Sequence, residues 1–230
     1  MISCYATVPA ALLCLLVSAR SAGAQDAGQG IKRTGFELGA RIGYSAPFAD
    51  AQKSVELSRE IAWQIPVELD LGYRESERVT YGLYFGYGFG KPGSSAYPFC
   101  DADGISCSAH TLRAGVQVLF HIAPRKPIGG WVSVGVGVEQ LRIGIQADMA
   151  DVHYSGAYLG FEAPSVQLGL DFRTRSGLAL GPFLGLLPGM YLDLDGQCTG
   201  RGCVNVPGVS IGEKALHLWF VFGVRGALLL

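Results

Sequence analysis

A two-residue alternation of apolar and polar or small residues returns eight times along this 230-residue chain. A β-strand places successive side chains on opposite faces, so this period predicts strands that each have one apolar face. In the closing segment HLWFVFGVRG, Phe220 and Phe222 lie on the apolar side, and Arg225 lies on the mixed side. The eight predicted strands cover residues 36–44, 62–73, 80–90, 111–122, 131–139, 165–173, 177–185 and 217–226.

The connections between these strands alternate between long and short. Short turns are expected at residues 74–78, 123–129 and 174–176, and longer loops at residues 45–61, 91–109, 144–156 and 194–214. This order predicts an antiparallel up-and-down meander whose long loops lie at one end. An even strand number with alternating loop length is typical of an all-β, eight-stranded transmembrane β-barrel.

The distribution of lysine distinguishes a membrane barrel from a soluble one. A soluble barrel of the lipocalin type would turn its apolar faces inward and its polar faces to water. Only 16% of the residues are charged, against about 25% in ordinary globular chains. All five lysines fall outside the predicted strands, so the apolar faces are expected to meet lipid. Aromatic residues near strand ends suit interfacial girdles, namely Tyr44, Trp63, Tyr73, Tyr81, Phe89, Phe120 and Phe172.

The opposite strand faces carry glycine, small polar residues and charges of both signs. In an eight-stranded barrel the interior is just wide enough for side chains, so these faces predict a filled lumen. His121 and His217 lie on the same faces and are interpreted as hydrogen-bonded filling. The expected lumen charge network consists of Glu37, Arg41, Glu68, Asp70, Arg113, Glu139, Asp171, Arg173 and Arg225.

The first 24 residues contain an apolar run followed by Ala22, Gly23 and Ala24, a pattern typical of a secretory signal peptide. The expected organisation is a signal peptide at residues 1–24, a periplasmic leader at 25–33 and the barrel at 34–230. Beyond the signal, no uninterrupted apolar stretch of about 18 residues predicts a transmembrane helix.

Four cysteines beyond the signal form two close pairs in predicted loops, Cys100 with Cys107 and Cys198 with Cys203. Export permits disulfides, and local pairing is favoured among the three connectivities; zinc is the alternative. Each pair has an Asp-x-Asp-Gly sequence beside it. Its carboxylates could bind Ca²⁺, although turn formation explains them more simply and no metal is predicted; they are Asp101, Asp103, Asp193 and Asp195.

The predicted barrel resembles the small outer-membrane β-barrels of the OmpA transmembrane domain, OmpX and OmpW type. The resemblance implies a monomer in the outer membrane of a Gram-negative-type bacterium, in contact with lipid and lipopolysaccharide and inserted by the barrel-assembly machinery. It implies a role in envelope structure or surface recognition through loops that meet an extracellular ligand or surface. An OmpW-like narrow pore for small apolar solutes is the alternative. Lys and Arg (18) nearly balance Asp and Glu (19), so nucleic acid is not an expected partner, and no cofactor is expected.

One short string resembles a catalytic motif. Val152-His153-Tyr154-Ser155 is similar to the His-x-Ser motif of the PagL family of outer-membrane lipid A deacylases. The resemblance implies His153 as general base, Ser155 as nucleophile and Glu162 as the nearest acid. A polar loop-to-strand junction explains the string more simply, so no enzyme is predicted and a deacylase remains the alternative.

Overall fold

The computed structural model describes residues 34–93, 97–147, 152–174, 176–200, 203 and 206–230. The predicted signal peptide (1–24) and leader (25–33) lie outside the described residues. The elements are β1 (Gly35–Gln52), β2 (Val55–Glu56), α2 (Leu57–Glu60), β3 (Ile61–Arg74), β4 (Val79–Pro92), η2 (Pro98–Asp101), β5 (Ile105–Ile122), β6 (Ile128–Ala147), β7 (Val152–Arg173), β8 (Leu178–Thr199), β9 (Val206–Ser210) and β10 (Leu216–Leu229). None of the helices among these residues is long and apolar enough to cross a membrane.

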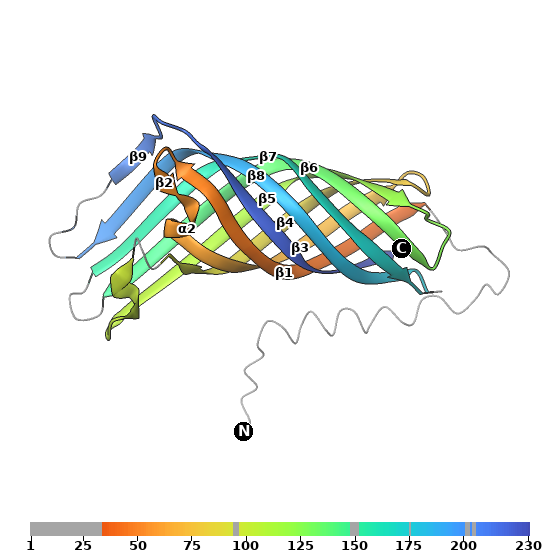
Figure 1. Cartoon of the computed structure of the whole chain (residues 1–230), viewed down its shortest axis with the longest axis horizontal. Helices are drawn as coiled ribbons and strands as arrows, with labels where there is room; N and C mark the ends of the chain where they lie inside the picture. The colour runs from red at the N-terminus through yellow and green to blue at the C-terminus, as the bar shows by residue number, and fades with distance from the viewer. Residues whose placement is uncertain (1–33, 94–96, 148–151, 175, 201–202, 204–205) are drawn as a thin grey trace, which may run out of the picture. The chain divides into compact units, whose positions relative to one another are not determined.

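Eight of the strands close into a ring. β1, β3, β4, β5, β6, β7 and β8 pair in chain order, and β10 pairs with both β8 and β1 (Figure 1). Every one of these pairings is antiparallel. The predicted eight-stranded antiparallel barrel is therefore confirmed. Closure leaves no free sheet edge along the paired length, which a strand in hydrocarbon could not tolerate.

The two ends of the barrel differ. The connections β3–β4, β5–β6 and β7–β8 are short and lie at the end where β10 finishes, here called the short-turn end. The opposite, long-loop end carries α2 and η2, together with the two short strands β2 and β9, which pair with β1 and β8 (Figure 1). The sequence predicted this segregation of loop lengths but neither short strand.

Several strands are longer than predicted. Residues 144–156 were expected to form a loop, but β6 continues to Ala147 and β7 starts at Val152. β8 likewise continues to Thr199 in the expected 194–214 loop. These extensions retain backbone pairing to their neighbours, but their apolar side chains, such as Leu141 and Ile143, face inward and their polar ones, such as Arg142, face outward. They therefore do not continue the outward apolar pattern by which the strands were predicted.

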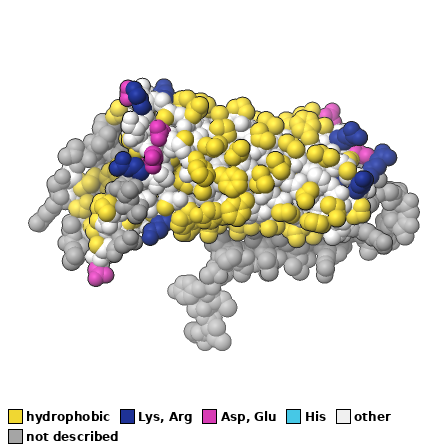
Figure 2. Space-filling view, in the orientation of Figure 1, with side chains coloured by type: hydrophobic (Ala, Val, Ile, Leu, Met, Phe, Trp, Pro, Cys, Tyr) yellow, Lys and Arg dark blue, Asp and Glu magenta, His cyan; other side chains and the backbone are white. Residues whose placement is uncertain are grey.

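The outer wall carries the apolar faces. Large apolar side chains point outward along every strand of the ring, with Phe36 67% exposed, and Figure 2 shows them as a belt bordered at both ends by charged side chains. Aromatic contacts lie near both edges of this belt. Phe36 packs edge-on against Tyr73 toward the short-turn end, and Tyr44 stacks on Trp63 toward the long-loop end. The belt is the pattern expected of a barrel surrounded by lipid.

The inner wall uses glycine where a bulky side chain must lie flat. Tyr84 from β4 is buried and rests over Gly115 and Gly137, which are paired on β5 and β6. A Cβ at Gly115 would lie 2.3 Å from the Val136 carbonyl oxygen and 2.5 Å from the Tyr84 hydroxyl. Real side chains do not approach so closely, so the position of Tyr84 depends on this glycine pair.

Replacing Gly115 by alanine is therefore expected to lower the free energy of unfolding by about 1–3 kcal/mol, the usual cost of overpacking. Gly130 is the matched control, since a Cβ there would lie 3.7 Å from its nearest neighbours. Urea unfolding of the lipid-reconstituted barrel, followed by tryptophan fluorescence, measures both variants. Equal unfolding midpoints for Gly115→Ala and Gly130→Ala would contradict this account of Tyr84.

Candidate functional site

The lumen is crossed by buried charged side chains, beginning near the short-turn end with Arg225. Its Nη2 lies 2.6 Å from Glu37 Oε1 and its Nη1 lies 3.4 Å from Asp171 Oδ1. Its guanidinium lies 5.0 Å from the ring centroid of Trp131. Arg74 bonds the second oxygen of Glu37. This group joins β10, β1, β7, β6 and β3 across the interior, with Arg225 only 1% exposed.

The middle of the lumen is organised around Arg41. Its guanidinium bonds Asp70 and lies 2.6 Å from Glu68 Oε1. It also donates to the amide oxygens of Gln167 (2.5 Å) and Gln117 (3.0 Å). Arg41 therefore connects four side chains from β3, β5 and β7, and all of them face inward.

A third group lies nearer the long-loop end and centres on Glu139. Tyr191 donates its hydroxyl hydrogen to Glu139 Oε1 at 2.5 Å, and Trp219 Nε1 donates to the same oxygen at 3.0 Å. Arg113 Nε lies 3.2 Å from the other oxygen, and its guanidinium lies 5.1 Å from the Trp219 ring centroid. His217 Nε2 lies 3.7 Å from that second oxygen.

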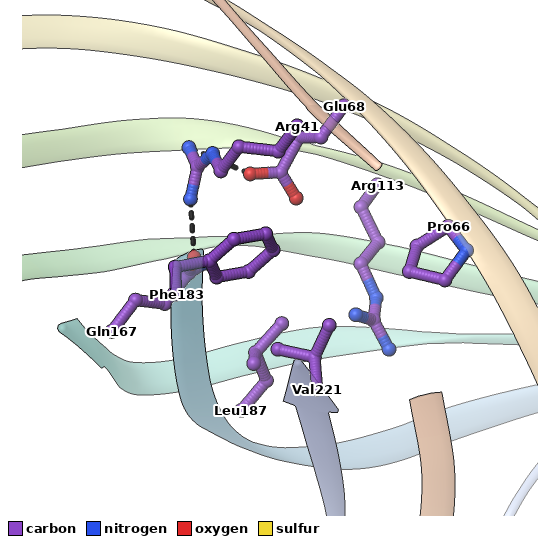
Figure 3. A pocket seen from close by; sticks show the side chains of 8 residues that line it. All are labelled: Arg41, Pro66, Glu68, Arg113, Gln167, Phe183, Leu187 and Val221. Carbon is purple, nitrogen blue, oxygen red and sulfur yellow. Dashed lines mark hydrogen bonds and ion pairs between the residues drawn. The ribbon is translucent and has the colours of Figure 1, made fainter. Parts of the chain in front are cut away.

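These groups leave little free volume. A cavity of about 10 Å³, room for about one water molecule, is lined by residues of the middle and third groups (Figure 3). Figure 3 shows Arg41 and Glu68 on one side of it, Arg113 on another, and the apolar side chains of Phe183, Leu187 and Val221 below them. Around this cavity, the described side chains fill the lumen.

The structure places the nine sequence-predicted lumen residues as follows. All nine take part in the contacts above except Arg173, which is half-buried near the short turns and lies 3.4 Å from Asp171. The alternation had not indicated Arg74, which was expected in a turn, or Tyr191, which was expected in a loop approach. Gln117 and Gln167 could have been chosen, because both share the inward parity of their strands.

An apolar cap follows the three charged groups at the long-loop end. Leu57 of α2, Ile61 and Leu141 are fully buried, and Ile143 and Ile211 are nearly so. Within this cap lies a carboxyl group, because Glu60 ends the single turn of α2 and is 7% exposed. Tyr97 donates its hydroxyl hydrogen to Glu60 Oε2 at 2.8 Å.

Burial changes the titration of this cap. Removal from water raises the pKa of Glu60 above its ordinary value of 4.5, although the hydrogen bond from Tyr97 and the charge of Arg59 oppose the shift. The same burial and the neighbouring Glu60 raise the pKa of Tyr97. The cap thus contains an acid that is protonated more readily than an exposed one.

The cysteines form two local disulfides at the long-loop end. Cys100 of η2 is bonded to Cys107 of β5, and Cys198 of β8 is bonded to Cys203. Each bond closes a short segment and anchors it to a strand of the ring. The neighbouring aspartates do not converge: Asp103 and Asp193 are exposed, Asp195 accepts from Gln197 at 3.5 Å, and the side chain of Asp101 lies outside the described part. Among the described residues, no three His, Cys, Asp or Glu side chains could hold a metal together.

The catalytic-looking residues lie on opposite faces of β7, because Glu162 is an odd number of residues from His153 and Ser155, and a β-bulge next to Glu162 decides which face is inward. Pairing of β6 with β7 shifts between Gly135–Ser165 and Gly137–Glu162, so Ala163 and Pro164 form an additional step. On the Val152 side of the bulge, the even-numbered residues of β7 face the lumen, whereas on the other side the odd-numbered residues do. Glu162 therefore points into the lumen, 2% exposed, whereas His153 and Ser155 are exposed on the outer face. The structure does not bring Glu162 to His153, and Pro164 inside a strand was the available signal for the bulge.

The comparisons with known proteins concern the fold. No family model and no curated protein matches the sequence. A solved major outer membrane protein from Thermus thermophilus is 12% identical, with 86% of this chain and all of that chain covered and a TM-score of 0.56. The outer membrane protein AlkL in lipid bilayers (12% identity, 90% and 96% covered, TM-score 0.49) and Neisserial surface protein A (9%, 85% and 97%, 0.47) are also similar. The Thermus likeness shows that the chain has the fold of a small outer-membrane β-barrel.

The Arg225 group yields a stability prediction. Arg225→Met retains side-chain length but leaves Glu37 and Asp171 without this partner, so we expect the free energy of unfolding to fall by about 3–5 kcal/mol. Denaturant unfolding in lipid vesicles measures it. Arg125→Met is the control, because Arg125 pairs with Glu77 on the exposed surface and its loss should leave the midpoint unchanged. An unchanged midpoint for Arg225→Met would show that the lumen pair is not structural.

Glu60 yields a pH prediction. An acid whose pKa is raised by folding binds its proton more tightly in the folded cap. The stabilisation is therefore complete below pH 4.5 and is lost as the pH rises through the raised pKa. Hydrogen exchange of residues 57–61, corrected for intrinsic rates, should accelerate over that range. Glu60→Gln should remove the dependence, whereas the exposed Glu56→Gln should retain it. Persistence in Glu60→Gln would assign the titration elsewhere.

Proposed function

We propose that this outer-membrane β-barrel is a closed, non-conducting scaffold that acts in envelope structure or surface recognition through its disulfide-bonded long-loop end. The observation that carries the proposal is the filled interior. Three groups of buried charged side chains and an apolar cap follow one another along the lumen. The cavity beside Arg41 and Arg113 has room for about one water molecule. A barrel filled in this way offers an external partner only its ends and its outer wall.

The long-loop end is the better candidate for contact with a partner. It holds α2, η2, β2 and β9, and both disulfides fix segments of it to the ring. Loops held by a rigid scaffold are where binding sites usually lie. In our proposal this end faces the cell exterior, the short-turn end faces the periplasm, and the barrel acts as a monomer surrounded by outer-membrane lipid after insertion by the barrel-assembly machinery.

The two alternative functions have less support. A lipid A deacylase would require an acid to orient His153, and Glu162 lies on the other side of the barrel wall. A narrow pore for apolar solutes would require an apolar path, whereas the lumen is crossed by the Arg41 and Arg225 groups. The proposal therefore places function at the long-loop end rather than in the wall chemistry or the lumen.

A planar bilayer tests the filled lumen. Wild-type protein that shows the heat-dependent gel shift of a folded barrel is expected to give no discrete conductance steps, because the charged groups and the cap obstruct the path. A reconstituted open porin serves as the positive control. Discrete steps from the purified wild type would overturn the closed-scaffold proposal and support a pore.

Whole cells separate the two roles of the proposed scaffold. If the protein supports envelope structure, its loss should raise uptake of the apolar dye N-phenyl-1-naphthylamine. If it acts in surface recognition, its loss should leave dye uptake constant and lower the adsorption of cells to arrayed glycans and extracellular proteins. The matched variant replaces residues 99–104 with a Gly-Ser segment and carries Cys107→Ser, so that β5 and the eight-stranded ring stay intact and no thiol is left unpaired. No change in either measurement would contradict both roles.

A further inference from the structure

We propose that the outer wall of the barrel carries a binding site for the phosphorylated headgroup of an outer-leaflet glycolipid, formed by Lys91, His110 and Arg142. This inference rests on the proposed orientation, in which the long-loop end faces the cell exterior. It assigns a partner to the wall rather than to the loops. The ligand class is a phosphorylated sugar headgroup that carries acyl chains.

The strand register brings the three side chains together. Phe89 of β4 pairs with His110 of β5, and His110 pairs with Arg142 of β6. Lys91 lies two residues beyond Phe89 and shares its outward face, so it is the diagonal neighbour of His110. Directly opposed side chains on paired strands lie about 5 Å apart at Cβ and diagonal ones about 7–8 Å. Three consecutive strands therefore present basic side chains at one level.

This level is the outer edge of the apolar belt. The ring of His110 stacks on Tyr87 at 5.7 Å between centroids and meets Phe89 edge-on at 6.3 Å. Tyr87 and Phe89 are both exposed on the outer wall and belong to the aromatic border of the belt. Figure 2 shows charged side chains beginning where the apolar belt ends. Aromatic borders mark the level of lipid headgroups, so the three basic residues lie where phosphates are found.

Arg142 is held toward the membrane. Its Nε donates to Gln140 Oε1 at 3.0 Å, and Gln140 lies one outward position nearer the belt. This bond directs the guanidinium along the wall toward lipid rather than toward the solvent above. A guanidinium has five N–H donors whose geometry suits a phosphate, and lysine adds a compact positive charge.

The charge around the site favours an anion. Along the row that contains Arg142, the next strands present Ala157 on β7 and then Asp195 on β8. Neighbouring strands are about 4.8 Å apart, so Asp195 lies roughly 10 Å from Arg142 along the wall. The wall is thus basic over β4, β5 and β6 and acidic over β8. A glycolipid matches both the basic sector and the apolar belt when its phosphate lies beside the basic side chains and its acyl chains lie over Phe89 and Leu112.

Native mass spectrometry of the full barrel in detergent tests the site. The probes are bisphosphorylated hexa-acyl lipid A and the same lipid A without phosphates. We expect wild-type protein to retain the phosphorylated form at least fivefold more than the dephosphorylated form. In K91A/R142A this preference should fall below twofold, because the anion loses both fixed charges. The control R125A/K126A removes two positive charges from the short-turn end and should keep the wild-type preference.

Three results would overturn the inference: equal retention of both lipids by wild type, an unchanged preference in K91A/R142A, or displacement of lipid A by 10 mM inorganic phosphate, which would indicate a site for free anion. The heat-dependent gel shift verifies that each variant is folded. Arg142→Gln is the milder variant and should lower the preference at least twofold. Conductance in planar bilayers reports the closed scaffold separately, so a conducting barrel that retains phosphorylated lipid A would reject the proposed function and leave this site intact.

Discussion

Backbone hydrogen bonding is the constraint on which this architecture depends. Hydrocarbon supplies no partner for a peptide N–H or C=O, so a β-structure can span lipid only as a closed ring. Here β10 provides closure by pairing with β8 on one side and β1 on the other. Once the ring is closed, alternate side chains of each strand have different surroundings. One face of each strand meets lipid, and the other faces the interior of an eight-stranded barrel, which is just wide enough for side chains.

The lumen is filled by charges that are arranged to avoid one another. Arg41 and Arg225 are directly opposed in the β1–β10 register, an unfavourable placement for like charges. The two guanidinium groups bind different acidic partners and so point away from each other. Arg225 contacts Glu37 and Asp171, and Arg41 contacts Asp70 and Glu68. Each guanidinium joins several strands, so the ionic groups connect the inside of the barrel wall as hydrogen bonds connect its backbone. In the proposed scaffold, binding sites for partners therefore lie at the ends and on the outer wall of the barrel.

The surfaces of the long-loop end combine two kinds of chemistry. Inside the ring, the apolar cap buries Glu60 against Tyr97 and covers the charged groups on their long-loop side. Outside the ring, the basic sector on β4, β5 and β6 lies directly above aromatic side chains of the belt. The disulfides hold the connecting segments beside both regions. In the scaffold that we propose, the barrel presents a headgroup contact and a fixed set of loops, and nothing passes through its centre.

The sequence by itself determined the strands within the belt, their lipid-facing sides and the segregation of short turns, because a two-residue period is a local property that every membrane strand must show. It also indicated which charges face inward. Only the tertiary structure decided which of them pair, since the partners of Arg41 and Arg225 lie up to 188 residues away and depend on strand register. It also decided the strand lengths above the belt, where apolar side chains face inward instead of outward, and the placement of Glu162. There one bulge at Ala163 and Pro164 exchanges the faces of β7, so Glu162 points into the lumen and His153 and Ser155 point outward.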